Sequence, residues 1–253
     1  MRHFLRDDDL SPAELVEVLD LADTLKKDRF AARPLAGPQT VAVLFDKSST
    51  RTRVSFSVGI AELGGYPLVL DAAASQLGRG ESIEDTAKVM GRMVDAIMLR
   101  TGPHETLLEL DRHAGVPVIN GLTYEHHPCQ ALADAQTLRE RFGPLGGLRL
   151  AYLGDGNNVC VSLMIVAALT GMAFTAACPD GFTPPPEIVD WASRISLEQG
   201  GSVRVVSDPL TAVAGARATE PSSCVARSAA GLRTRVRSIS TDSRRFATDE
   251  PAQ

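Results

Sequence analysis

The chain has 253 residues, of which 44% are hydrophobic and 23% are charged, a composition typical of soluble globular proteins. Its length is sufficient for one large domain or two smaller ones. The 26 Lys and Arg residues and the 31 Asp and Glu residues give a formal net charge of -5, which disfavours a nucleic acid or an acidic membrane as a partner.

The N-terminal segment has no apolar stretch of the kind found in signal peptides, and no run of about 18 apolar residues occurs in the sequence. We therefore expect a cytoplasmic protein that does not enter a membrane. The four cysteines are widely spaced and include no C-x-x-C pair, so we expect reduced thiols and no metal site.

The first predicted element is a helix from Pro12 to about Lys27. Ser11 is placed to cap its N-terminus, and Glu14 is placed to accept in return from the backbone of Ser11. Apolar residues then follow at helical spacing: Leu15, Val18, Leu19, Ala22 and Leu25. This pattern indicates a structural helix that packs along one face.

Beyond a proline-containing loop at residues 33–38, short apolar runs alternate with helical patterns. The predicted strands are Val41–Phe45, Pro67–Leu70, Ala96–Leu99 and Pro117–Ile119. The predicted helices are Thr50–Leu63, Ser82–Met93, His104–Ala114 and Pro128–Phe142. Such alternation predicts an α/β fold in which helices flank a mostly parallel sheet.

A second series of strands and helices begins at Arg149, after a glycine-rich stretch at 143–147. Its predicted elements are the strands Arg149–Leu153, Ala173–Ala177 and Val203–Val206 and the helices Asn158–Thr170, Pro186–Gln199 and one starting near Pro209. We expect one α/β domain over residues 1–143 and part of a second over residues 148–217.

The last 36 residues, 218–253, have a different composition. They hold six Arg, six Ala, six Ser and four Thr, few large apolar residues, and a net charge of +2. This segment cannot bury enough apolar surface to offset its ordering entropy, so we expect a disordered tail. A shifted reading frame in a GC-rich gene would produce the same change, and the other two frames of the coding DNA would test this hypothesis.

The strongest local signal is the segment 45–53, which follows a predicted strand and opens a predicted helix. Ser49, Thr50 and Thr52 offer hydroxyl groups, and Arg51 offers a guanidinium that can bind two oxygens at once. The free N–H groups of a helix N-terminus favour an anion. An ordinary helix cap with solvated arginines fits the segment nearly as well, and the spacing matches neither a Walker loop nor a dinucleotide fingerprint.

Two further segments end at the same predicted sheet edge, where ligand sites of α/β proteins form. Arg100 follows a predicted strand, and His127 and Gln130 open the helix that begins at Pro128. Taken alone, Arg100 fits a surface charge and His127 fits a helix cap, and we expect His126 not to take part. We expect the guanidinium groups and His127 to face one another across a shared cleft.

A polar loop at 75–82 is of a kind that closes over ligands. A glycine-rich turn at 154–158 joins a predicted strand to a helix, but it lacks the third glycine of a dinucleotide-binding turn.

Together these segments resemble the transcarbamylase family, and within it the ornithine carbamoyltransferases, over almost all of residues 2–217. The resemblance rests on Ser-Thr-Arg-Thr at 49–52, His-Pro-Cys-Gln at 127–130, the loop at 76–88 and the glycine-rich turn at 154–158. That turn resembles the ornithine branch. The aspartate branch carries a catalytic lysine in the loop, whereas here no lysine lies between Lys47 and Lys88.

The resemblance implies transfer of the carbamoyl group from carbamoyl phosphate to the δ-amine of L-ornithine, giving L-citrulline and phosphate in arginine biosynthesis. It implies no metal and no organic cofactor. By the same resemblance, the phosphate would be bound by Ser49, Thr50, Arg51 and Thr52.

The resemblance also implies roles at the reacting carbonyl. Thr52, Arg100 and His127 would contact its oxygen, and Gln130 would accept from the carbamoyl NH2 group. The barrier is electrostatic, so donors placed in advance should supply most of the acceleration.

Two further implied roles concern the amine substrate and the assembly. Asn158 would bind the α-amino acid end of ornithine. Gln76 would reach into the carbamoyl phosphate site of a neighbouring subunit, which implies a homotrimer.

The resemblance ends near residue 217. Neither the D-x-x-x-S-M-G element nor the H-C-L-P element of the family occurs, so we expect an incomplete second domain and leave the activity of this chain open. Two alternatives therefore stand beside the enzyme. One is a non-catalytic remnant that binds carbamoyl phosphate or phosphate, and the other is a transcarbamylase for another amine such as putrescine.

Overall fold

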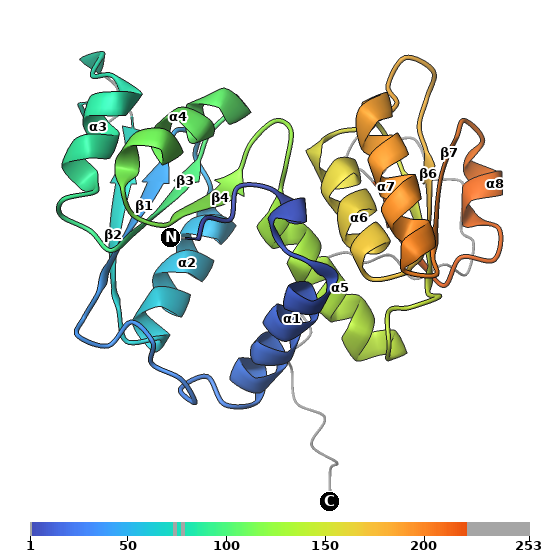
Figure 1. The fold of residues 1–253 in the computed structure, drawn as a ribbon, viewed down its shortest axis with the longest axis horizontal. Helices are drawn as coiled ribbons and strands as arrows, with labels where there is room; N and C mark the ends of the chain where they lie inside the picture. The colour runs from blue at the N-terminus through green and yellow to red at the C-terminus, as the bar shows by residue number, and fades with distance from the viewer. Residues whose placement is uncertain (1, 73–74, 77–78, 222–253) are drawn as a thin grey trace, which may run out of the picture.

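The computed structural model describes residues 2–72, 75–76 and 79–221, which form two parallel sheets flanked by helices (Figure 1). The first sheet has the order β2-β1-β3-β4. Its strands are β1 (Thr40–Phe45), β2 (Tyr66–Asp71), β3 (Ala96–Arg100) and β4 (Val118–Leu122). Each neighbouring pair is parallel.

The second sheet has the order β7-β6-β5-β8, and its neighbouring strands are also parallel. Its strands are β5 (Arg149–Leu153), β6 (Ala173–Ala177), β7 (Ser202–Val206) and β8 (Ala218–Pro221). The predicted α/β class with mostly parallel sheets is confirmed.

Helices cover both faces of the first sheet. On one face, α2 (Thr50–Glu62) contributes Ile60 to a cluster with alternate residues of β1. On the other face, α3 (Ile83–Met90) and α4 (His104–Ala114) pack on the remaining residues of β1 and on β3. Both faces of the strands are therefore buried, which explains their nearly continuous apolar runs.

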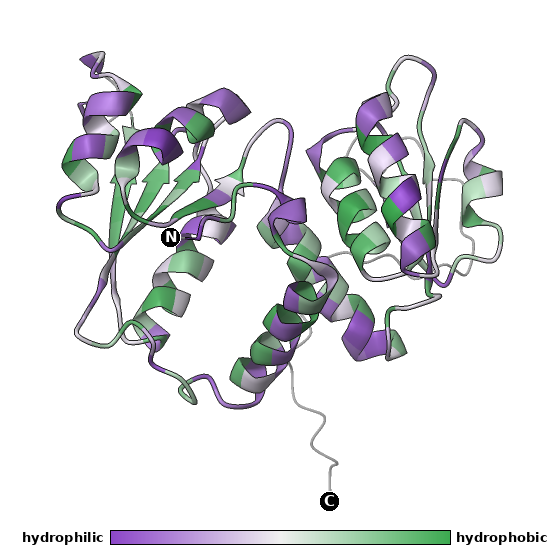
Figure 2. Ribbon diagram, in the orientation of Figure 1, coloured by the Kyte–Doolittle hydropathy of each residue, from purple (hydrophilic) through white to green (hydrophobic). Residues whose placement is uncertain are grey.

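The second sheet is covered on one face by α6 (Asn158–Leu169) and α7 (Pro186–Glu198). The short helix α8 (Pro209–Val213) packs with alanines of β5 and β6 in a separate small cluster. The α6 helix is buried from Cys160 to Leu169, and Figure 2 shows it as apolar along its length.

Two helices connect the sheets. The α1 helix (Pro12–Lys27) packs on α5 (Pro128–Phe142), and both contribute to the core cluster that contains α6 (Figure 1). The predicted capping box of α1 is present, because Ser11 Oγ accepts from the Glu14 N–H at 3.3 Å and Glu14 accepts from the Ser11 N–H at 2.9 Å.

The N-terminal segment lies beside β4, which sequence reasoning did not predict. Phe4 forms a parallel bridge with Ile119, and the amide of Asn120 donates to the carbonyl of Leu5 at 2.8 Å. A short 3-10 helix, η1 (Asp7–Asp9), follows. The segment thereby brings Asp7 to the junction between α5 and α6.

Most predicted boundaries of helices and strands lie within one residue of the structure, and two predicted ends differ from it by three residues. The α3 helix ends at Met90 rather than Met93, because Gly91 is its C-cap and packs directly against the carbonyl of Ala114. The β4 strand runs to Leu122 rather than Ile119, since the pairing with β3 and the N-terminal segment carries it through polar and glycine positions that have low strand propensity.

The predicted disordered tail begins too early. Ala218–Pro221 forms β8, which pairs with β5, and Ala218 is fully buried. Strand pairing thus outweighs the local composition on which the prediction relied. Residues 222–253, the rest of the predicted tail, lie outside the described residues, as does the pair 77–78 of the polar loop.

None of the helices in residues 2–72, 75–76 and 79–221 combines the length and the apolar character that a membrane span requires. Cys129, Cys160 and Cys178 are free thiols there.

Candidate active site

The phosphate loop lies between β1 and α2, at the carboxyl edge of the first sheet. Ser49 is the N-cap of α2 in an extended conformation, and its side chain makes no capping hydrogen bond. The first N–H groups of α2 therefore have no side-chain acceptor from their own cap. Together with the hydroxyls of Thr50 and Thr52, they offer donors to an anion.

Arg100 reaches this loop from the neighbouring strand. It is paired in register with Phe45 of β1, and its Nη1 donates to Thr52 Oγ1 at 3.0 Å. Burial and the nearby charge of Arg51 lower the pKa of Arg100. Its Nε is buried without a hydrogen-bond partner among the described residues. Two guanidinium groups thus lie close together, an arrangement that an anion would stabilise.

His127 joins the two arginines from the N-cap position of α5. Burial, with a smaller contribution from the charge of Arg100, lowers the pKa of His127 to about 4. The imidazole is therefore neutral near pH 7 and carries one N–H donor. Its Nδ1 is buried and has no hydrogen-bond partner in the described part of the chain. The structure thus brings Arg51, Thr52, Arg100 and His127 together as one cation-rich cluster.

Gln130 lies one turn after His127 on α5, which places both on the same face of the helix. Its Nε2 donates to Asp134 Oδ1 at 2.9 Å, so its amide oxygen stays available as an acceptor. Burial raises the pKa of Asp134 to about 7.

Asn158 is the first residue of α6, next to the turn that precedes α5. Its Nδ2 donates to the carbonyl of Thr123 at 2.5 Å. This contact places the amide group between α6 and the loop that leads to His127.

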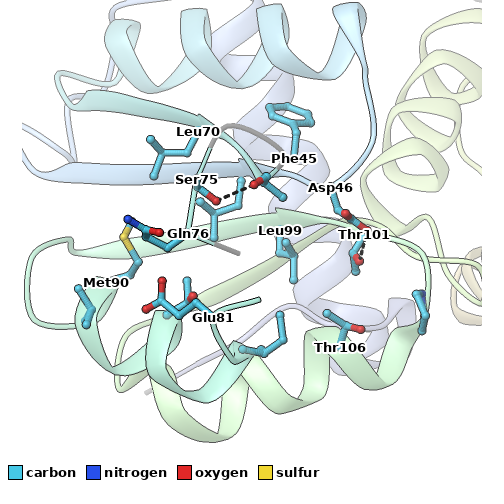
Figure 3. A pocket seen from close by; sticks show the side chains of 16 residues that line it. Phe45, Asp46, Leu70, Ser75, Gln76, Glu81, Met90, Leu99, Thr101 and Thr106 are labelled. Atoms are coloured by element: carbon cyan, nitrogen blue, oxygen red, sulfur yellow. Dashed lines mark hydrogen bonds between the residues drawn. The ribbon is translucent and has the colours of Figure 1, made fainter. Parts of the chain in front are cut away.

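Gln76 lies elsewhere in this chain. It lines a cavity of about 670 Å³ between the carboxyl edge of the first sheet and α3 and α4, together with Glu81, Met90 and Thr101 (Figure 3). No contact joins Gln76 to Arg51, Arg100 or His127 in the described part of the chain.

The sequence did not predict several residues that lie near the cluster. The Lys47 ammonium lies 4.0 Å from the ring centroid of Tyr124 and donates to its hydroxyl, which ties the phosphate loop to the loop before α5. A network of Asp7, Ser162 and His126 lies under His127. No local sequence pattern predicts these contacts. Lys47 and Tyr124 are 77 positions apart, and Asp7 and Ser162 are 155 positions apart.

Two basic residues next to the cluster are engaged elsewhere. Arg53 forms an ion pair with Asp71 and lies 4.7 Å from the ring centroid of Phe45. His126 is buried and lies beside Asp7 instead of facing the arginines. Among the described residues, no group of three or more His, Cys, Asp and Glu side chains is arranged to hold a metal ion.

Parallel sheets with a cation-rich cluster at the carboxyl edge define an α/β protein suited to an anionic substrate. The family described as "Aspartate/ornithine carbamoyltransferase, carbamoyl-P binding domain" matches residues 2–140, and the companion "Asp/Orn binding domain" matches residues 146–223. The chain belongs to the aspartate/ornithine carbamoyltransferase family.

Individual relatives agree with this assignment. The ornithine carbamoyltransferase of Acidothermus cellulolyticus is 59% identical over 216 residues, which cover 85% of this chain and 69% of the relative. That of Leifsonia xyli is 56% identical with the same coverage. The solved ornithine carbamoyltransferase of Pyrococcus furiosus has a TM-score of 0.82 at 42% identity, covering 87% of this chain and 71% of that structure.

Proposed function

We propose that this chain carries the site for transfer of a carbamoyl group from carbamoyl phosphate to the δ-amine of L-ornithine, giving L-citrulline and phosphate. The names of the relatives support carbamoyl transfer to ornithine, and the description of the matching family supports carbamoyl phosphate as the donor. The convergence of Arg51, Thr52, Arg100 and His127 at the N-terminus of α2 is the structural observation that carries the proposal.

In this proposal the phosphate group binds at the start of α2. Ser49, Thr50 and Thr52 donate from hydroxyl and backbone groups, and Arg51 forms a two-point contact with phosphate oxygens. The phosphate dianion also offsets the repulsion between Arg51 and Arg100. Binding is therefore expected to be strong for a dianion and weak for a neutral analogue.

The reacting carbonyl lies between Arg100 and His127. The ornithine amine attacks the carbonyl carbon, and negative charge grows on the carbonyl oxygen and then on the departing phosphate. Arg100, His127 and Thr52 stabilise the oxygen, and Gln130 orients the carbamoyl NH2 group through its amide oxygen. The low pKa of His127 makes it a neutral hydrogen-bond donor, and the leaving phosphate can itself accept a proton from the amine.

Asn158 contacts the α-amino acid end of ornithine in the proposed complex. Gln76 serves the carbamoyl phosphate site of a neighbouring subunit, since it lies apart from the cluster of its own chain. The assembly that follows is a homotrimer with shared sites. We place the reaction in the cytoplasm and in arginine biosynthesis.

A second candidate function is binding of carbamoyl phosphate or phosphate without transfer. The position of the cluster in the chain favours this function. Its four side chains, Arg51, Thr52, Arg100 and His127, all precede the second sheet in the sequence. The amine site, by contrast, depends on the second sheet.

The two functions are distinguished by one pair of measurements on the 253-residue chain. Citrulline formation from carbamoyl phosphate and ornithine supports the transferase, and a parallel reaction with putrescine tests the amine. A rise in melting temperature with inorganic phosphate and no turnover with either amine supports the binding function. If the chain shows no turnover and no stabilisation by phosphate, both proposed functions are contradicted.

A further inference from the structure

A buried aspartate and a buried serine lie directly behind His127. The Asp7 side chain is fully buried, and Ser162 of α6 is 0% exposed. Ser162 Oγ donates to Asp7 Oδ2 at 2.7 Å, and the same hydroxyl accepts from the His127 backbone N–H at 2.8 Å. A chain of two hydrogen bonds thus joins η1, α6 and the first turn of α5.

The direction of each hydrogen bond follows from the groups involved. A backbone N–H can only donate, so Ser162 Oγ accepts from His127 and directs its own proton to Asp7 Oδ2. His126 Nδ1 lies 3.2 Å from the same carboxylate oxygen, which assigns its proton to Nδ1. Asp7 therefore fixes the orientation of Ser162 and of His126.

Such a carboxylate is costly to bury. Among the described residues, His126 is the only basic group within ion-pair distance of Asp7, and Asp7 Oδ1 has no hydrogen-bond partner. A buried acid with so little compensation is a weak contributor to stability. The contacts of Asp7 therefore bear on the placement of its neighbours more than on stability.

The neighbour that matters for the site is His127. Its Nδ1 has no partner in the described part of the chain, so no hydrogen bond to that ring nitrogen holds the imidazole in place. Its backbone is outside the helical region, with φ of -137° and ψ of 64°. The direction of the imidazole toward Arg100 depends on how the backbone at this position is held, and the Ser162 hydroxyl holds it.

We propose that Asp7 and Ser162 are positioning residues that hold the His127 backbone, and through it the imidazole, against the reacting carbonyl. This inference rests on the proposed function for the role of His127. The inference adds that the N-terminal segment and α6 set the position of the His127 imidazole at the edge of the first sheet. The second domain thereby acts on the carbonyl as well as on the amine.

The experiment compares Ser162→Ala with Ser196→Ala in the full chain. Both serines lie on helices and are 0% exposed, but Ser196 is on α7 and its hydroxyl has no hydrogen-bond partner among the described residues. Inorganic phosphate and carbamoyl phosphate serve as probes in calorimetric titrations, and nitrogen-detected NMR follows the His127 ring against pH. Thermal melts verify that each variant is folded.

We expect Ser162→Ala to weaken carbamoyl phosphate binding at least about fivefold, since one neutral hydrogen bond at the carbonyl is lost. Phosphate affinity should change less than twofold, because the arginines keep their places. The pKa of His127 should rise from about 4 toward 6.5 as the ring gains access to water. Ser196→Ala should match the wild type in all three measurements.

Two Asp7 variants provide a graded test. Asp7→Ala should reproduce the effect of Ser162→Ala, whereas Asp7→Asn keeps an acceptor oxygen and should stay within twofold of the wild type. Equal His127 titration and equal ligand affinities in Ser162→Ala and Ser196→Ala would overturn the proposal. If Ser162→Ala does not fold, equal effects of Asp7→Ala and Asp7→Asn overturn it instead. Absence of carbamoyl phosphate binding by the wild type would contradict the proposed function, while the NMR comparison still decides the positioning role.

Discussion

Arg51 and Arg100 are the two charges on which binding of the substrate dianion depends. Arg51→Ala and Arg100→Ala should each weaken carbamoyl phosphate binding about 100-fold or more, because water does not replace a charged partner of a half-buried anion. Titration calorimetry measures the affinity. If the chain turns over, kcat/KM should fall by orders of magnitude, and values within tenfold of the wild type for both variants would disprove the assignment.

Arg53 offers a matched control on the same helix. Its guanidinium is already bound to Asp71 and stacked near Phe45. Arg53→Ala should therefore leave the affinity for carbamoyl phosphate within about threefold of the wild type.

His127 should act as a neutral donor over the physiological range. Because burial and Arg100 hold the pKa of His127 at about 4, carbamoyl phosphate affinity should show no step attributable to this group between pH 5.5 and 8. His127→Gln keeps a donor and should retain measurable activity, whereas His127→Ala should lose the activity and weaken the affinity for carbamoyl phosphate at least about fivefold. A glutamine variant as inactive as the alanine variant would point to proton transfer instead.

At the scale of elements, the best predictions concern helices with clear end signals. Three predicted helices match the structure at both ends: Pro12–Lys27, His104–Ala114 and Pro128–Phe142. A serine cap, a proline or a following glycine marks their boundaries. The sequence does not predict the end of β4 at Leu122, because Asn120 and Gly121 are held in the strand by residues far away in the sequence.

The residues of the site also fall into those that the sequence predicts and those that it does not. The phosphate loop was predictable because its hydroxyls and arginine are adjacent in sequence at a strand-to-helix junction. The convergence of Arg100 and His127 on this loop follows from parallel strand order. Asp7 and Ser162 could not be found, because they meet only after the N-terminal segment adds to β4 and η1 reaches α6.

Two helix glycines allow a prediction about packing. A Cβ at Gly91, the C-cap of α3, would lie 1.6 Å from the Ala114 carbonyl oxygen, whereas nothing lies within 4 Å of a Cβ at Gly59 in α2. Gly91→Ala should lower the free energy of unfolding by more than about 2 kcal/mol. Gly59→Ala should raise it by about 0.5–1 kcal/mol through helix propensity. Urea unfolding followed by circular dichroism measures both, and a loss of stability in Gly59→Ala would contradict the packing of α2.

At the scale of the whole molecule, a partly buried acid on β8 makes stability depend on pH. Burial, and then the charge of Asp134, raises the pKa of Glu220 from 4.5 to about 8. Between these values the folded state binds more protons than the unfolded state, so stability should fall as the pH rises from 5 to 8.5. Asp134, with a pKa of about 7, acts in the same direction.

Glu220→Gln should reduce this loss of stability by about 1 kcal/mol, a value kept small because Glu220 is partly open to solvent. The exposed Glu17→Gln should leave the pH dependence as in the wild type. Urea unfolding at pH 5.5 and 8.5 gives the comparison. An unchanged slope in Glu220→Gln would show that the acid is not desolvated in solution.

The burial of α6 from Cys160 to Leu169 has one more consequence. Its amide groups lie under α5 and α7 and behind the second sheet, so they meet solvent only when the surrounding layers separate. In deuterium oxide this helix should be the slowest segment to exchange, with protection equal to that of global unfolding. Since α6 also begins at Asn158 and carries Ser162, the contacts with the Thr123 carbonyl and the His127 N–H both start from the helix that we expect to exchange most slowly.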